Sequence, residues 1–203
     1  LPLHGMNYLA HAYLSFDEPD ILLGNMISDF IKGKSQFNYP GPVQRGIKLH
    51  RLIDAFTDTH PATQEIKLFF RPAYRLYAGA FADIVYDHFL AIDRGEFGNP
   101  GNLSDFAART YRLLEIKSPQ FPPAFQRMFP FMKQQDWLSN YRLKEGIRNS
   151  FTGLQRRAMY IPETNTAFEI FNNQYAAIQD YYNLFFPDVK KFAREQFDTL
   201  VKN

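Results

Sequence analysis

The sequence predicts an all-α fold built as one helical domain. Three observations support this prediction: apolar residues recur at helical spacing, alternating strand patterns are hard to find, and several prolines stand where helices would begin. The 203 residues are 45% hydrophobic and 17% aromatic, which suffices for one substantial core. We take residues 6–203 as the domain, with Met6 as the native start and residues 1–5 as a leader.

Ten helices are expected, at residues 6–15, 19–32, 41–58, 61–72, 74–93, 102–117, 121–134, 138–159, 165–185 and 187–202. The second, fourth and tenth have a proline in the first turn, namely Pro19, Pro61 and Pro187. The apolar stripe of the third is formed by Leu49, Leu52, Ile53 and Phe56. The fifth is apolar nearly all round, as expected of a central helix. GEFGNPGN then makes the strongest break, while SPQFPP and IPETN are typical of loops between the later helices.

Composition excludes several classes of function. Charged residues make up 22% of the chain and nearly balance at +2, so no overall field indicates a nucleic-acid partner. The chain has no cysteine, which excludes disulfides, thiolate metal sites and cysteine nucleophiles and fits a reducing compartment. No run approaches the roughly 18 apolar residues of a membrane span. We therefore expect a cytoplasmic protein.

The third helix carries reactive side chains beside its apolar stripe, within LHRLIDAFTDTH at 49–60. His50 lies on the flank of the stripe, and Asp54 lies one turn further on, so both side chains can point into one cavity. Asp58 lies further round and either supports this site, is solvated or pairs with Arg51. The alternative for the whole set is an exposed helix flank with ion pairs.

Other apolar segments carry similar polar pairs. These pairs, each four residues apart, are Asn7 with His11, Asn25 with Asp29, and Asp83 with Asp87. His88 projects from the opposite side of the fifth helix, as either a core histidine or a ligand. Apart from His4 in the leader, all histidines lie between residues 11 and 88, so any imidazole chemistry comes from the first half of the chain.

These groups predict a divalent cation, because a buried carboxylate without a partner costs several kcal/mol and few Lys or Arg residues lie nearby in sequence. Mixed carboxylate and imidazole ligands without sulfur suit Mn²⁺, Mg²⁺ or Fe²⁺. The expected ligands are Asp29, His50 and one or both of Asp83 and Asp87, supported by Asn7, His11, Asn25 and Asp58. The alternative is a set of unrelated structural polar groups. A Gly-rich phosphate loop and a G-x-S-x-G elbow are both absent from the sequence.

Four motifs, MNYLAHAYLS, LLGNMISDFIKG, GIKLHRLIDAFTDTHP and RLYAGAFADIVYDHFLA, resemble in order and spacing the acyl carrier protein phosphodiesterase family. The resemblance covers residues 6–94. It implies an all-helical metallohydrolase, distantly like HD-domain phosphohydrolases. The implied activity is Mn²⁺-dependent removal of 4′-phosphopantetheine from the serine of holo-acyl carrier protein.

The resemblance also implies roles for single residues. Asp29 matches a position important for activity, and the other matching positions are His50, Asp54, Asp87 and His88, with Asp83 one turn before Asp87. Arg51 is a candidate clamp for the phosphate through its planar fork, or else the partner of Asp54 or Asp58 in an ion pair.

Because acyl carrier proteins are acidic, the surface that docks one should be basic. One candidate patch contains Lys32, Lys34, Arg45 and Lys48, and a second contains Arg142, Arg148, Arg156 and Arg157. Each of these side chains is alternatively just solvated. Two other functions stay open: an HD-like phosphohydrolase acting on another phosphoester such as a nucleotide, and a non-catalytic helical module that binds a carrier protein.

Overall fold

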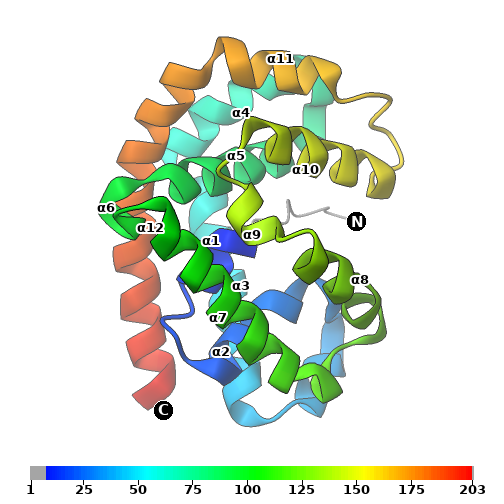
Figure 1. Cartoon of the computed structure of the whole chain (residues 1–203), viewed down its shortest axis with the longest axis vertical. Coiled ribbons are helices and arrows are strands. Elements are labelled where there is room, and N and C mark those ends of the chain that lie inside the picture. Colours follow the sequence, from blue (N-terminus) through cyan, green and yellow to red (C-terminus); the bar gives the residue numbers. More distant parts are fainter. Residues whose placement is uncertain (1–7, 203) are drawn as a thin grey trace.

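The structure, a computed structural model, describes residues 8–202 (Figure 1). Its α-helices are α1 (Tyr8–Tyr13), α2 (Pro19–Ile27), α3 (Gly41–Thr59), α4 (Pro61–Tyr74), α5 (Ala78–Ile92), α6 (Arg94–Phe97), α7 (Pro100–Ile116), α8 (Pro123–Gln134), α9 (Trp137–Asn140), α10 (Lys144–Arg157), α11 (Asn165–Asn173) and α12 (Tyr175–Lys202). Short 3₁₀ turns are η1 (Ser28–Phe30), η2 (Gly33–Asn38), η3 (Arg75–Tyr77) and η4 (Ser118–Gln120). No strand occurs among residues 8–202, so the prediction of one all-α domain is confirmed; its HD-like character stays a prediction.

Several predicted helix boundaries are wrong. Helix α2 ends at Ile27 rather than at residue 32, and α5 begins at Ala78 rather than at residue 74. Two further differences change how the later helices are divided. Pro187 does not begin a helix; it lies inside the 28-residue α12, and the break instead falls at Gln174, between α11 and α12. A proline removes one helical hydrogen bond, but α12 packs along α3, α4 and α5, and this packing keeps the helix continuous. The predicted helix 138–159 is also divided into α9 and α10. At that turn the chain doubles back so tightly that a Cβ on Gly146 would lie 2.0 Å from the carbonyl oxygen of Asn140.

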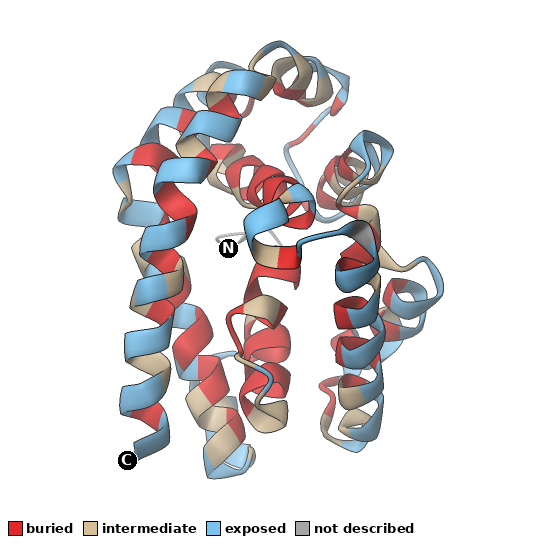
Figure 2. Cartoon of the chain, turned by 60° about the vertical axis from the view of Figure 1, so that its left-hand side comes forward, coloured by how far each residue is buried: buried red, intermediate tan, exposed pale blue. Residues whose placement is uncertain are grey.

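Helix α5 is the centre of the packing, as its all-round apolar sequence predicts. It contacts α1, α4, α10 and α12, and nearly all of its residues are buried. Phe81 stacks on Phe70 and meets Phe151 edge to face, so aromatic rings join α4, α5 and α10. Figure 2 shows the buried residues gathered on the inward faces, while long stretches of the outer helices are exposed.

Helices α2 and α3 touch backbone to backbone. A Cβ on Gly24 would lie 2.1 Å from the carbonyl oxygen of Val43, and one on Gly46 would lie 2.4 Å from that of Ile21. Since real Cβ contacts are much longer, only glycine fits at either position. This approach brings Asn25, the residue after Gly24, within reach of His50, one turn after Gly46.

Helix α1 has only six residues and cannot be stable alone. Its N-terminal N–H groups are satisfied from α5: those of Leu9 and Ala10 donate to the two carboxylate oxygens of Asp87, at 2.9 and 2.8 Å. Asp87 is buried and therefore ties α1 to the central helix. None of the described helices is long and apolar enough to cross a membrane.

Candidate metal centre

Four polar side chains meet where α1, η1 and α3 come together. Nε2 of His11 lies 3.1 Å from Oδ1 of Asp54. Nε2 of His50 lies 3.1 Å from Oδ2 of the same carboxylate and 3.2 Å from Oδ1 of Asp29. The two imidazole rings stack, with centroids 3.9 Å apart and planes 17° from parallel. We call His11, His50, Asp54 and Asp29 the His–Asp cluster.

Asn25 sets the orientation of both rings. Nδ1 of His11 lies 2.7 Å from the side-chain oxygen of Asn25, and Nδ1 of His50 lies 2.8 Å from its backbone oxygen. The amide nitrogen of Asn25 donates to the backbone oxygen of His11 and to Oγ of Ser15, which fixes which end of the amide faces the ring. Because both acceptors are oxygens, each Nδ1 carries a hydrogen.

With Nδ1 protonated, each neutral ring directs the lone pair of Nε2 at carboxylate oxygens. A lone pair facing a carboxylate at 3.1 Å is repulsive unless a cation lies between them, and that cation is either a proton or a metal ion. An Nδ1–H held by an amide or carbonyl oxygen is also the usual second contact of a metal-bound histidine. The donor set therefore fits a divalent metal.

The geometry meets the spacing that one ion needs. One ligand atom each from His11, His50 and Asp54 lie within 4.8 Å of one another. The imidazoles are nearly enclosed, whereas Asp54 and Asp29 keep 18% and 23% of their side-chain surface exposed. A cation held here would be bound by the imidazoles on its buried side and accessible to solvent on the side of the carboxylates. The accessible side leaves room for water and a substrate oxygen.

The two histidines differ in protonation when no metal is bound. Burial lowers the pKa of His50, but the carboxylates of Asp54 and Asp29 outweigh it and raise that pKa to about 10. Burial and the charge on His50 lower the pKa of His11, and Asp54 only partly offsets them. Burial raises the pKa of Asp54, but His50 and His11 hold it far below its ordinary value. The metal-free cluster thus holds one extra proton, on His50.

Comparison with known proteins agrees with this chemistry. A sequence model of the family described as acyl carrier protein phosphodiesterase matches residues 6–189. The chain belongs to this family. It is 28% identical over 191 residues to the acyl carrier protein phosphodiesterase of Yersinia pestis, covering 94% of this chain and 99% of the relative. It is 30% identical over 182 residues to that of Photorhabdus laumondii, covering 90% and 92%. No solved structure matches the chain significantly.

In this member of the phosphodiesterase family, the cluster contains three residues that the sequence predicts to act in catalysis or metal binding, namely Asp29, His50 and Asp54. It also contains His11, to which the sequence assigned only a supporting role. Asn25, which the sequence predicts to support the metal ligands, contacts Nδ1 of both histidines. Asn7, the other expected partner of His11, lies outside the described residues.

The remaining candidates on α5 lie outside the group of ligand atoms. Asp83 has Asp54 and Asp58 as electrostatic neighbours, and burial together with these charges raises its pKa well above the ordinary value. Asp87 caps α1, as described above, and burial raises its pKa to about 8. His88 is engaged at both ring nitrogens, 2.8 Å from the backbone oxygen of Tyr141 and 2.8 Å from the hydroxyl of Tyr175.

Two charged residues on α3 also lie outside the cluster. Asp58 is exposed and forms an ion pair with Lys67 at 2.8 Å rather than with Arg51. Arg51 is exposed as well, and its guanidinium donates to the side-chain oxygen of Gln36 at 2.8 Å and to the backbone oxygen of Ile31 at 3.4 Å.

Proposed function

We propose that the protein removes 4′-phosphopantetheine from the serine of holo-acyl carrier protein by metal-dependent hydrolysis of the phosphodiester. The observation that supports this most directly is the convergence of two Nε2 atoms on two carboxylates, with both Nδ1 atoms held by Asn25. Family membership supplies the class of substrate. The cytoplasm is the compartment we propose, since a chain without cysteines suits a reducing environment.

His11, His50 and Asp54 would hold the metal ion, with Asp29 beside them, and Mn²⁺ is the ion we propose, with Mg²⁺ or Fe²⁺ as alternatives for the same donors. A divalent ion at this site supplies charge for the phosphoryl oxygens and lowers the pKa of bound water. Asn25 keeps each Nε2 directed inward. Asp29 is the most exposed carboxylate of the cluster, and we assign to it acceptance of the proton from the attacking water.

Docking of an acidic carrier protein would use exposed basic side chains. In the first patch Lys32, Lys34 and Lys48 are exposed and Arg45 is half-buried, and in the second patch Arg156 and Arg157 are exposed. We propose the second patch as the principal contact, because both arginines also line a cavity that reaches Tyr8, on the helix that carries His11. Charges of this kind raise the association rate more than they raise the affinity.

One assay tests the proposal: incubate the protein with holo-carrier protein and Mn²⁺, then determine the mass of the carrier protein. Loss of the phosphopantetheine mass is the expected result, with a double variant, His11→Ala with His50→Ala, as the inactive control. Unchanged holo-protein together with turnover of a nucleotide would assign the protein to another phosphohydrolase activity. Binding of the carrier protein without turnover would assign it to a non-catalytic module.

A further inference from the structure

A cavity lies beside α10. Its volume is about 450 Å³, within the range of roughly 300–1,000 Å³ that small-molecule sites occupy. Helix α10 contributes one stripe to the wall, at i, i+3, i+4, i+7 and i+11, formed by Gly146, Asn149, Ser150, Gly153 and Arg157. At 1.5 Å per residue this stripe is about 16 Å long. The wall therefore suits an extended, chain-like ligand better than a compact one.

The cavity reaches α1, the helix that carries His11 of the His–Asp cluster. Tyr8 lines the cavity and stands three residues before His11 on α1, so the two side chains are neighbours on one helix face. The hydroxyl of Tyr8 donates to Sδ of Met128 on α8 at 3.3 Å, which holds the ring at the cavity wall. A ligand whose phosphate lies at the cluster can extend past Tyr8 along α10.

The polar part of the wall consists mainly of amide side chains. Gln135, Asn140 and Asn149 each bring a carboxamide to the cavity. The indole N–H of Trp137 donates to the side-chain oxygen of Gln135 at 2.9 Å, which leaves the amide nitrogen of Gln135 as a donor. Carboxamides supply both donors and acceptors, the complement of a ligand that itself contains amide groups.

Hydroxyl groups and apolar rings complete the wall. The hydroxyls of Ser150 and Thr152 donate to backbone oxygens of their own helix, at 2.9 and 3.0 Å, so their oxygens are left to accept. Ile84 and the rings of Trp137 and Tyr141 provide the apolar surface. Amides alternating with methylene and methyl groups are the chemistry of pantetheine, which has two amides, a dimethyl centre and a thiol end.

We propose that this cavity binds the pantetheine arm of the substrate while the phosphate lies at the His–Asp cluster, an inference that rests on the proposed function. A nucleoside is the competing occupant. It would prefer a flat slot between parallel rings, but the rings of Tyr8 and Trp137 are 6.2 Å apart and tilted by 38°. The elongated amide wall favours the arm.

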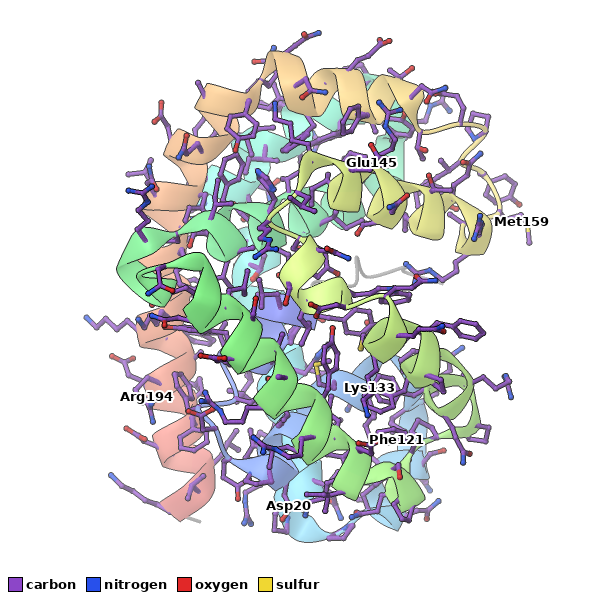
Figure 3. The ribbon with its side chains drawn as sticks, in the orientation of Figure 1. Asp20, Phe121, Lys133, Glu145, Met159 and Arg194 are labelled. Atoms are coloured by element: carbon purple, nitrogen blue, oxygen red, sulfur yellow. The ribbon has the colours of Figure 1, made fainter. Side chains whose placement is uncertain are left out.

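Trp137 is the only tryptophan of the chain, so its fluorescence reports on this cavity alone. The probe is phosphate-free pantetheine, whose thiol finds no cysteine to react with. Gly153→Leu fills the cavity, because a Cβ at Gly153 meets no heavy atom within 4 Å and the helix tolerates the side chain. Glu145→Leu is the matched control on the same helix: Glu145 is exposed and lies near the opposite end of α10 from Met159 (Figure 3).

Pantetheine should change the Trp137 emission saturably in the wild type and in Glu145→Leu, with an affinity at least tenfold weaker in Gly153→Leu. The ratio of the rate on holo-carrier protein to the rate on bis(p-nitrophenyl) phosphate should also fall at least tenfold in Gly153→Leu. Asn149→Leu, at an exposed position of the same wall, gives the same test if Gly153→Leu does not fold.

Equal pantetheine affinities in wild type and Gly153→Leu, no response in the wild type, or a response to AMP in place of pantetheine would each overturn the inference. The same experiments distinguish a failure of the proposed function from a failure of the cavity assignment. If pantetheine binds and Gly153→Leu weakens it, yet holo-carrier protein is not cleaved, the cavity assignment stands and the reaction does not. If cleavage proceeds and Gly153→Leu is normal, only the cavity assignment falls.

Discussion

Replacing Asn25 by alanine is expected to weaken Mn²⁺ binding by about 10- to 100-fold, the usual effect of removing a residue that orients a metal-bound histidine. The substitution removes the oxygen that holds Nδ1 of His11, 2.7 Å away. It leaves the backbone oxygen that holds Nδ1 of His50, because every residue at position 25 has one. Only one of the two imidazoles is therefore released.

The cost in stability follows from the same contacts. Alanine removes three buried hydrogen bonds: the one from His11 at 2.7 Å, and the two that the Asn25 amide donates to the His11 backbone oxygen and to Ser15, at 2.9 and 3.1 Å. At about 0.5–1.5 kcal/mol each, their loss amounts to about 1.5–4.5 kcal/mol. Since domains of this kind are stable by about 5–15 kcal/mol, we expect the variant to remain folded.

Electron paramagnetic resonance of free Mn²⁺ measures the affinity, and urea denaturation measures the stability. Ser15→Ala is the matched control, because it removes hydrogen bonds to Asn25 and to the His11 backbone but leaves the oxygen that orients the His11 ring. It should lose about 1–3 kcal/mol of stability and keep its Mn²⁺ affinity. If Asn25→Ala is destabilised yet binds Mn²⁺ as tightly as the wild type, His11 is not a ligand held by Asn25, and the reasoning is refuted.

Four further results are expected. Gly46→Ala should push α2 and α3 apart, because its Cβ would lie 2.4 Å from a backbone oxygen; urea denaturation should show a loss of about 1–3 kcal/mol, and Mn²⁺ affinity should fall with it. Asp29→Ala should abolish release of phosphopantetheine, measured by mass, with circular dichroism and cooperative melting retained. Because His50 carries a proton up to a pKa of about 10, Mn²⁺ binding at pH 7–8 should release one proton per ion, and the affinity should weaken as the pH falls; calorimetry in buffers of different ionisation enthalpy checks this. Reversing the charges of Arg156 and Arg157 should lower kcat/KM on holo-carrier protein and remove its dependence on salt, with Lys32 reversal as the comparison in the other patch.

The part of the cluster that lies on a single helix can be predicted from the sequence. His50 and Asp54 stand four residues apart on α3, and helical geometry alone places their side chains together. The distance of 3.1 Å between Nε2 of His50 and Oδ2 of Asp54 agrees with this. Asp29 joins them because the Gly24–Gly46 contact holds α2 against α3. The glycines are visible in the sequence, but their pairing is a property of the folded molecule.

The place of His11 in the cluster cannot be predicted from the sequence, for a related reason. Helix α1 has little periodic signal of its own, and its position depends on Asp87, some 77 residues later in the chain. Helix α5 is apolar nearly all round, so the sequence contains no preferred face from which to infer which helices its aspartates meet. Long-range contacts between α1 and α5 decide whether His11 or an aspartate of α5 reaches the cluster.

The adjacent pair Asp87 and His88 then acquires a common explanation. Asp87 faces one side of α5 and fixes α1, the helix that carries both Tyr8 and His11. His88 faces another side and holds the backbone oxygen of Tyr141, at 2.8 Å, in the wall of the cavity. One central helix thus positions the histidine end and the cavity wall relative to each other. A shift of α1 or of the segment at Tyr141 would separate the His–Asp cluster from the cavity. Asp87 and His88 can therefore matter for activity without touching a substrate.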